Sequence, residues 1–300
     1  MPTSTIVAGA SGYIGSHLVN RFEPGAKVAC ISRAELPNSG SKPSDHIFVP
    51  YDDIVRGDWS KLGGFAGGSL VHLIGTGRGM QSLDIWSANV ASTEMLLQMA
   101  KQLKLSRIVY LSGFGIPSSS SSSYYQAKQQ AERLIIDSGF PHLILRCSYV
   151  VGRQDELTPA IIDNAIDGRC EIPGSGKYRI QPLFIDDLVS VILAVLSSNT
   201  QVSKTVDVLG EAVSFEAFVR KLLKRLHIEC ELHSRTIEEF VREAVLSDNP
   251  ALSLDELGIL MSDIVGPPTR QVFGVKIRGI EAVIESVSAQ WLAGHEHQDL

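Results

Sequence analysis

The chain has 300 residues, of which 44% are hydrophobic and 20% charged, and its formal net charge is -6 at pH 7. This composition is typical of a globular protein with enough apolar material for a core, and the lack of clustered Lys and Arg argues against nucleic-acid binding. The four cysteines lie far apart without a CxxC pair, so we expect reduced thiols in a cytoplasmic protein and no metal site.

Short apolar runs alternate with amphipathic segments in the first half of the chain, as is typical of βαβ units. The predicted strands are Thr5–Ala8, Lys27–Ile31, Ile47–Pro50, Leu70–Ile74, Arg107–Ser112 and His142–Arg146. The predicted helices between them are Gly12–Phe22, Leu83–Leu103 and Tyr124–Ser138. Two segments rich in Ser, Pro or Gly, 36–45 and 118–123, are predicted loops, and Ser123 is a candidate cap for the helix that follows. The alternation predicts an α/β fold, a doubly wound parallel sheet with helices on both faces.

The second half of the chain is less regular. Its predicted helices are Leu157–Asp167, Asp187–Leu196, Phe215–Leu226 and Ile237–Val245, and its predicted strands are Val206–Leu209 and Ile228–His233. The most apolar stretch, Leu188–Leu196, is shorter than the about 20 residues that cross a bilayer, so we expect a core helix there and no transmembrane segment. The N-terminal residues also lack the basic and apolar regions of a targeting signal.

A glycine-rich turn joins the first predicted strand to the first predicted helix. Its sequence, GASGYIG over residues 9–15, spaces three glycines for a tight turn, close approach to a pyrophosphate and close helix–strand packing. The helix N-terminus offers N–H groups to phosphate oxygens. The candidate cofactor-binding residues of this turn are Gly9, Ser11, Gly12, Tyr13, Ile14 and Gly15.

The second strand ends in Ser32 and Arg33, where NAD-preferring sites carry an acidic residue that binds the ribose 2′-hydroxyl. A hydroxyl and a guanidinium suit the 2′-phosphate of NADP, although Glu35 lies close by. We therefore predict that NADP(H) is preferred and that NAD(H) is possible. Asp52, after the third strand, is a candidate for the adenine side of the site, with a solvated loop residue as the alternative.

Three further motifs accompany the glycine turn: VHLIG at 71–75, Asn89-Val90 with Thr93 in register, and Tyr124-x-x-x-Lys128. Together they resemble the extended and atypical short-chain dehydrogenases/reductases, over residues 5 to about 195. The resemblance implies a Rossmann core at 1–150. It assigns to 151–300 a mixed region, with late core elements at about 183–210 and a smaller C-terminal substrate lobe. It also implies that Ile74, Gly75, Asn89 and Lys128 contact the cofactor, and a homodimer is possible by analogy.

Tyr124 and Lys128 are four residues apart, so they share one face of their predicted helix. A nearby ammonium favours a phenolate, so we expect Lys128 to lower the pKa of Tyr124 from its usual value of about 10. Such a phenol can exchange a proton with an alcohol or carbonyl oxygen while hydride moves at carbon. Ser112 is the candidate third catalytic residue. His72, in an apolar strand, is predicted to be a core histidine.

Two positions depart from the family pattern. Phe114 aligns with the usual catalytic hydroxyl, and Ile180 aligns with the arginine that binds the diphosphate of sugar nucleotides, unless Arg153 or Arg179 replaces it. The Gln181-Pro182 segment is similar to relatives of the Rossmann-type accessory subunit of respiratory complex I. Three functions stay open: an oxidoreductase acting on a small molecule, a non-catalytic NADP(H)-binding assembly protein, and a nucleoside-diphosphate-sugar epimerase or dehydratase.

Overall fold

The computed structural model describes residues 4–35, 46–76, 82–115, 122–168, 170–198, 203–246 and 254–295. The chain divides into two compact units. The first comprises residues 1–147, 188–207 and 273–275, and the second comprises 148–187, 208–272 and 276–300. The chain therefore leaves the first unit after residue 147 and returns to it for two later segments.

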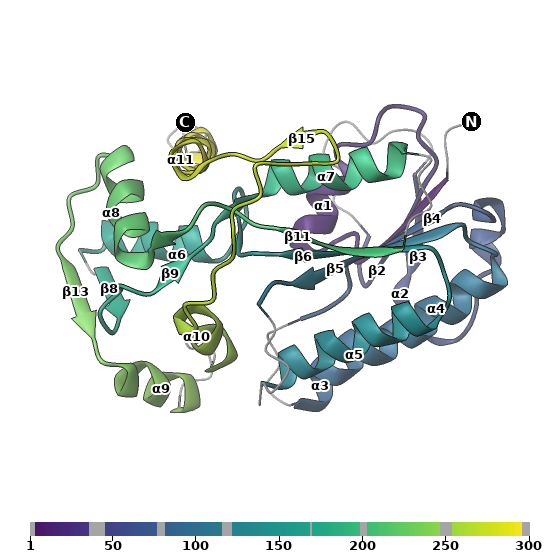
Figure 1. The fold of residues 1–300 in the computed structure, drawn as a ribbon, viewed down its shortest axis with the longest axis horizontal. Coiled ribbons are helices and arrows are strands. Elements are labelled where there is room, and N and C mark those ends of the chain that lie inside the picture. The colour runs from purple at the N-terminus through teal and green to yellow at the C-terminus, as the bar shows by residue number, and fades with distance from the viewer. Residues whose placement is uncertain are drawn as a thin grey trace. The chain divides into compact units, whose positions relative to one another are not determined.

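The first unit is built on a seven-stranded sheet with the order β11-β6-β5-β4-β1-β2-β3 (Figure 1). Neighbouring strands from β6 through β3 pair in parallel. The strands are β1 (Thr5–Ala8), β2 (Val28–Ser32), β3 (His46–Pro50), β4 (Ser69–His72), β5 (Arg107–Gly113), β6 (His142–Cys147) and β11 (Lys204–Val208). This order is that of a doubly wound Rossmann-type fold, which confirms the predicted fold class.

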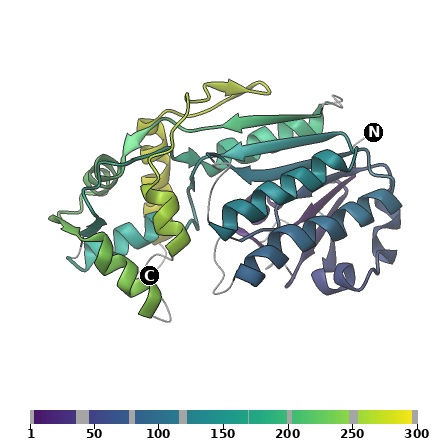
Figure 2. The same cartoon turned by 60° about the horizontal axis from the view of Figure 1, so that its bottom comes forward.

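Helices cover both faces of this sheet (Figures 1 and 2). They are α1 (Tyr13–Val19), α2 (Tyr51–Val55), a 3₁₀ helix at Ser60–Phe65, α3 (Ser82–Trp86), a π-helical turn at Ser87–Ala91, α4 (Ser92–Gln102), α5 (Ser123–Asp137) and α7 (Ile185–Ser197). Fully buried apolar residues of β1, β2, β4 and β5 pack against α4 to form the core of the unit.

The strand order places the change of winding direction between β1 and β4. In doubly wound folds, ligands bind at the carboxyl ends of the strands at this point. The glycine turn follows β1, and Gly75 lies three residues after the end of β4. The two segments are in close contact, because a Cβ atom on Gly9 would lie only 2.9 Å from the carbonyl carbon of Leu73.

A buried arginine on β5 holds the end of α7 in place. Arg107 is 8% exposed, and its guanidinium donates hydrogen bonds to the carbonyl oxygens of Val195, Leu196 and Ser198 and to the Ser69 hydroxyl. The last carbonyls of a helix have no partner within the helix, so a cation there satisfies them and favours the helix dipole. A residue early in the chain thus fixes a helix formed much later.

The second unit is a mixture of helices and short strands. It contains β7 (Val150–Val151), α6 (Leu157–Ile166), β8 (Cys170–Pro173), β9 (Arg179–Ile180), β10 (Leu183–Phe184), β12 (Val213–Ser214), α8 (Phe215–Arg225), β13 (Leu232–Arg235), α9 (Ile237–Leu246), α10 (Leu254–Met261) and α11 (Ile280–His295). A hairpin of β14 (Gln271–Val272) and β15 (Val275–Lys276) lies where the chain passes between the units.

Several predicted boundaries were wrong. The first helix is α1, shorter than predicted, and the strand predicted at 228–233 begins at Leu232. Ser122 rather than Ser123 is the N-cap of α5, and its side chain makes no capping hydrogen bond. Most of the two predicted loops lies outside the described residues.

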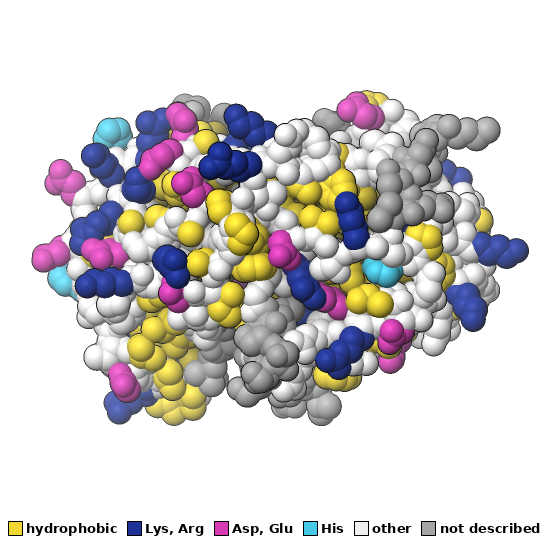
Figure 3. All heavy atoms as spheres, in the orientation of Figure 1, with side chains coloured by type: hydrophobic (Ala, Val, Ile, Leu, Met, Phe, Trp, Pro, Cys, Tyr) yellow, Lys and Arg dark blue, Asp and Glu magenta, His cyan; other side chains and the backbone are white. Residues whose placement is uncertain are grey.

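Acidic and basic side chains are interspersed over the described residues of the face drawn in Figure 3. No helix in the described ranges is both long and apolar enough to cross a membrane. Among the same residues, no group of three or more His, Cys, Asp and Glu side chains could hold a metal ion.

Candidate functional site

The glycine turn after β1 has a backbone that only glycine tolerates. Gly9 has a φ of +90°, and its N–H donates to the carbonyl oxygen of Ile31 at 2.9 Å. A Cβ atom on Gly15 would lie 2.1 Å from the Gly9 carbonyl oxygen, so a side chain there would push α1 away from the turn. Gly12 is the N-cap of α1 and has no side chain to cover the helix end. The turn therefore leaves this end open for a phosphate group.

The other predicted contacts around this turn differ in exposure. Ser11 is exposed, and Tyr13 and Ile14 are half-buried. Ser32 is buried and donates its hydroxyl hydrogen to the carbonyl oxygen of Ala34 at 2.7 Å. Arg33 is exposed directly after β2.

Asp52, considered as a possible loop residue, lies in the first turn of the short helix α2 and is exposed. Ile74 is half-buried, between the end of β4 and Gly75.

A π-helical turn between α3 and α4 presents Asn89 to the loop that follows β4. Asn89 is fully buried, and its amide nitrogen donates to the carbonyl oxygens of Thr76 at 3.0 Å and Ile85 at 2.8 Å. Its side-chain oxygen has no hydrogen-bond partner among the described residues. Single π-helical turns are frequent at functional sites, and an unpaired buried amide oxygen is an acceptor available to a ligand.

Lys128 reaches the same place from α5. The side chain is 6% exposed, and Nζ donates to the carbonyl oxygen of Leu111 at 3.2 Å. A Cβ atom on Gly75 would lie 2.5 Å from the Asn89 side-chain oxygen and 2.8 Å from Lys128 Nζ. The lysine and the asparagine therefore meet over the bare backbone of Gly75. Burial lowers the pKa of Lys128 to about 8.

Tyr124 lies one turn before Lys128, and its ring centroid is 6.0 Å from Nζ. Its hydroxyl lies over the end of β5, 3.8 Å from where a Cβ atom on Gly113 would be. Burial raises the pKa of Tyr124 to about 12, and the neighbouring Tyr125 and Cys147 act in the same direction. The expected lowering by Lys128 is therefore not found in this structure, because loss of water outweighs the ammonium.

Ser112 does not join the tyrosine. Its hydroxyl is buried, with no hydrogen-bond partner in the described ranges, and so it makes no hydrogen bond to Tyr124. Side chains alternate along a strand, and Tyr124 faces Gly113, the next residue. Phe114 is half-buried and offers only its backbone N–H, which bonds the Cys147 carbonyl oxygen at 2.9 Å.

Three residues near Lys128 were missed from the sequence. Glu132 lies one turn further along α5, and Arg146 and Cys147 end β6. The spacing of Lys128 and Glu132, again four residues, was the available signal. The pairing of Glu132 with Arg146 could not be predicted before the strand order was known.

The predicted departure in the second unit is Ile180. Ile180 is 6% exposed and apolar, and Arg179 forms an ion pair with Asp263, with Nε 3.0 Å from the carboxylate. Gln181 is buried; its side-chain nitrogen donates to the carbonyl oxygens of Gly210 and Gly266, and its side-chain oxygen accepts from the Gly266 N–H. The loss of the diphosphate-binding arginine at this segment stays a prediction.

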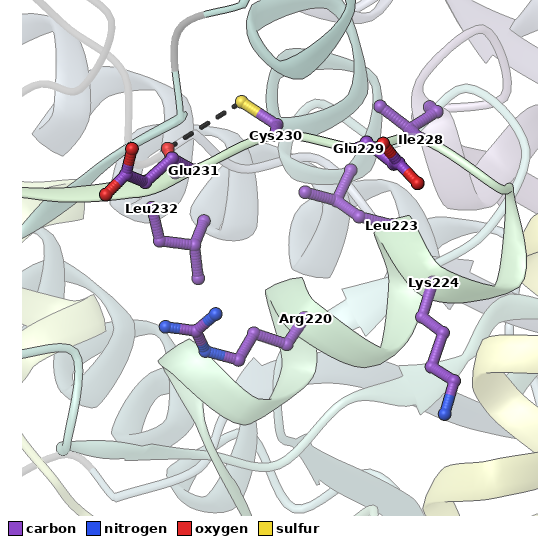
Figure 4. Close-up of a pocket in the computed structure, with 8 residues that line it drawn as sticks. All are labelled: Arg220, Leu223, Lys224, Ile228, Glu229, Cys230, Glu231 and Leu232. Carbon is purple, nitrogen blue, oxygen red and sulfur yellow. Dashed lines mark hydrogen bonds between the residues drawn. The ribbon is translucent and has the colours of Figure 1, made fainter.

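A surface pocket lies elsewhere in the second unit, between α8 and the segment that leads into β13 (Figure 4). Arg220 and Lys224 on α8 line it together with Glu229, Cys230 and Glu231 of that segment. None of the predicted site residues lines this pocket. The arrangement that carries the predicted chemistry is therefore the one at the carboxyl ends of β1, β4 and β5.

Known proteins resemble this chain in sequence and in fold. The model of the NAD dependent epimerase/dehydratase family matches residues 5–208. The mitochondrial NADH dehydrogenase [ubiquinone] 1 alpha subcomplex subunit 9 of Arabidopsis thaliana is 27% identical over 225 residues, which is 69% of this chain. The chain spans about half the length of that relative, since the match covers 54% of it.

Solved structures share the fold at low sequence identity. UDP-glucuronic acid 4-epimerase from Bacillus cereus, in complex with UDP-glucuronic acid and NAD, is 20% identical with a TM-score of 0.72, over 97% of this chain and 99% of that one. dTDP-glucose 4,6-dehydratase from Bacillus anthracis, in complex with NAD, is 16% identical with a TM-score of 0.75, over 98% of both chains.

Proposed function

The chain belongs to the NAD dependent epimerase/dehydratase family, whose members are enzymes of the short-chain dehydrogenase/reductase type, and we propose that it transfers hydride at an alcohol or carbonyl carbon of a small molecule. The observation that supports this function best is the meeting of Lys128 Nζ and the unpaired Asn89 oxygen over Gly75, at the switch point of the sheet. The donor Lys128 Nζ and the acceptor Asn89 Oδ1 converge there on the backbone of Gly75, which has no side chain. This arrangement fits the ribose and nicotinamide end of a cofactor.

The rest of the cofactor would extend from Gly75 toward β2. The glycine turn would hold the pyrophosphate, with Gly9, Gly12 and Gly15 keeping the backbone accessible. Arg33 and Ser32 would bind a ribose 2′-phosphate, which is the basis for proposing NADP(H) over NAD(H). Asp52 would lie toward the adenine. The bound cofactor supplies or accepts the hydride.

Tyr124 would exchange the proton. Its raised pKa keeps the phenol protonated near neutral pH, so it is suited to donate a proton to a carbonyl oxygen in the reductive direction. Lys128, with a lowered pKa near 8, still carries its charge on most molecules at pH 7 and would hold the cofactor ribose.

We also propose that the second unit supplies the side chains that recognise the substrate. Ser112 would contribute only if its hydroxyl turned toward the substrate.

Tyr124→Phe tests the proposed proton transfer. Removing the hydroxyl should lower turnover of a carbonyl panel with NADPH at least 100-fold, because acid catalysis contributes about 10²–10⁴-fold. NADPH affinity, measured by quenching of protein fluorescence, should stay within about twofold. Tyr125→Phe, the neighbouring tyrosine on α5, is the matched control and should keep activity. Equal activity of the Tyr124→Phe protein and the parent would remove the proposed mechanism.

A second candidate is a protein that binds NADP(H) without turning it over. Phe114 at the usual hydroxyl position favours it, as does similarity to a subunit of NADH dehydrogenase. In this case NADPH would raise the melting temperature by mass action, with no turnover of any substrate tested.

A sugar-nucleotide epimerase is the third candidate, and the pairing of Arg179 with Asp263 weighs against it. Lack of UDP-sugar binding by calorimetry would dismiss it.

A further inference from the structure

A buried carboxylate lies on the same helix as the lysine of the proposed cofactor site. Glu132 lies one helical turn after Lys128 on α5 and is 4% exposed. Arg146 on β6 binds it with two parallel hydrogen bonds, from Nε at 3.0 Å and from a terminal nitrogen at 2.6 Å. Such a fork-to-fork pair fixes both the position and the orientation of the carboxylate.

The two members of this ion pair differ in their surroundings. The Arg146 side chain is 42% exposed, whereas the Glu132 side chain is 5% exposed. A surface cation would therefore keep much of its hydration if the pair were lost, but the carboxylate would not. Arg146 thus serves to hold a negative charge within the interior of the unit, where charge is screened least.

That negative charge acts on Lys128. Burial lowers the pKa of Lys128, and Glu132 is the first of the groups that oppose this effect. The other titratable groups that interact with Lys128 are Tyr124 on α5, Tyr110 on β5, His72 on β4 and Cys147 on β6. All four are neutral near pH 7, because each is buried with a pKa that favours its uncharged form.

We propose that Glu132, clamped by Arg146, is a positioning residue that keeps the Lys128 ammonium charged beside Gly75. This inference rests on the proposed function, since it assigns Lys128 to the cofactor ribose. It adds a residue outside the Tyr-x-x-x-Lys pair and explains why a carboxylate is kept in the interior of α5. A merely structural tie between α5 and β6 would stabilise the unit without affecting the charge of the lysine.

Glu132→Gln separates these two roles, because the amide keeps the shape and loses the charge. The pH at which NADPH affinity falls, which tracks the loss of the Lys128 proton, should move down by about one unit or more. Affinity should then drop about fivefold at pH 8 and approach a tenfold drop at pH 9, since one pKa unit is a factor of ten once both proteins have mostly lost the proton. Glu216→Gln removes the carboxylate of an exposed ion pair on α8 and is the matched control, with no shift expected.

The charge of Lys128 can also be followed without any cofactor. The rate of Lys128 acetylation by acetic anhydride, measured by peptide mass spectrometry against pH, should show the same downward shift in Glu132→Gln. This second readout decides the inference even if the parent protein binds no nucleotide, which would overturn the proposed function alone. Should Glu132→Gln fail to fold, Glu132→Asp should show a smaller shift in the same direction. A less stable protein with an unchanged Lys128 midpoint would overturn the inference.

Discussion

At the scale of single residues, Arg33 decides the proposed cofactor preference. It is exposed at the end of β2 and would pair with a 2′-phosphate that NADPH carries and NADH lacks. Arg33→Ala should therefore raise the dissociation constant for NADPH about tenfold and leave that for NADH unchanged, since a charge-assisted hydrogen bond contributes about 1.5–3 kcal/mol. Arg133→Ala, an exposed arginine on α5, serves as control. Equal weakening of both nucleotides would show that Arg33 does not read the phosphate.

Residues were predictable from the sequence where a motif of the resembling family carries them. Gly75, Asn89 and Lys128 were identified from motifs, and the structure brings their polar atoms together. The protonation of Tyr124 was not predictable, because its pKa depends on how much water the folded chain removes. The role of Glu132 was not predictable either, because it depends on Arg146. The position of Arg146 opposite Ser112 follows from the pairing of β5 with β6.

At the scale of elements, one buried histidine joins strand β4 to helix α4. His72 Nε2 lies 2.8 Å from the Thr93 hydroxyl, which itself donates to the Asn89 carbonyl oxygen at 2.6 Å. The histidine is therefore the donor, as a neutral core residue, and this matches its predicted role. Burial first, and Lys128 second, lower its pKa to about 3. The unfolded chain therefore binds a proton between about pH 6.5 and 3 that the folded chain excludes.

His72→Gln removes this titration and keeps an N–H donor. The free energy of unfolding of the parent should fall more steeply between pH 6.5 and 4 than that of the variant, because only the parent gains stability as pH rises through this window. The difference should reach a few kcal/mol, at about 1.4 kcal/mol for each pH unit. Urea unfolding at several pH values measures it. Parallel profiles for the two proteins would show that His72 takes up its proton without unfolding.

Predictions of elements succeeded where apolar runs are short and bounded by turns. Strand β1 was predicted with its observed limits, Thr5–Ala8. Helix α11 was missed, because it buries the β-branched residues Val283, Ile284 and Val287, which favour strands when read locally. The π-helical turn at Ser87–Ala91 was also missed, since one extra residue in a turn does not alter the hydrophobic pattern enough to be recognised.

At the scale of the whole molecule, the two units are not consecutive stretches of sequence. The segment 188–207 supplies most of α7 and β11 to the first unit. A fragment ending at residue 150 would lack this segment, and the apolar residues that α7 covers would face water. We expect this fragment to show no cooperative thermal transition by circular dichroism, in contrast to the full chain. A sharp transition at the melting temperature of the full chain would show that residues 1–150 are self-sufficient.

Arg107 has a consequence for the order of events on the ribosome. Its guanidinium finds its carbonyl partners only when α7 has been made, roughly ninety residues after β5. Synthesis at about 5–20 residues per second makes this wait several seconds long. During that time the β6 side of the sheet has an open edge and a positive charge without its acceptors. The nascent chain is thus expected to need protection from aggregation in this interval.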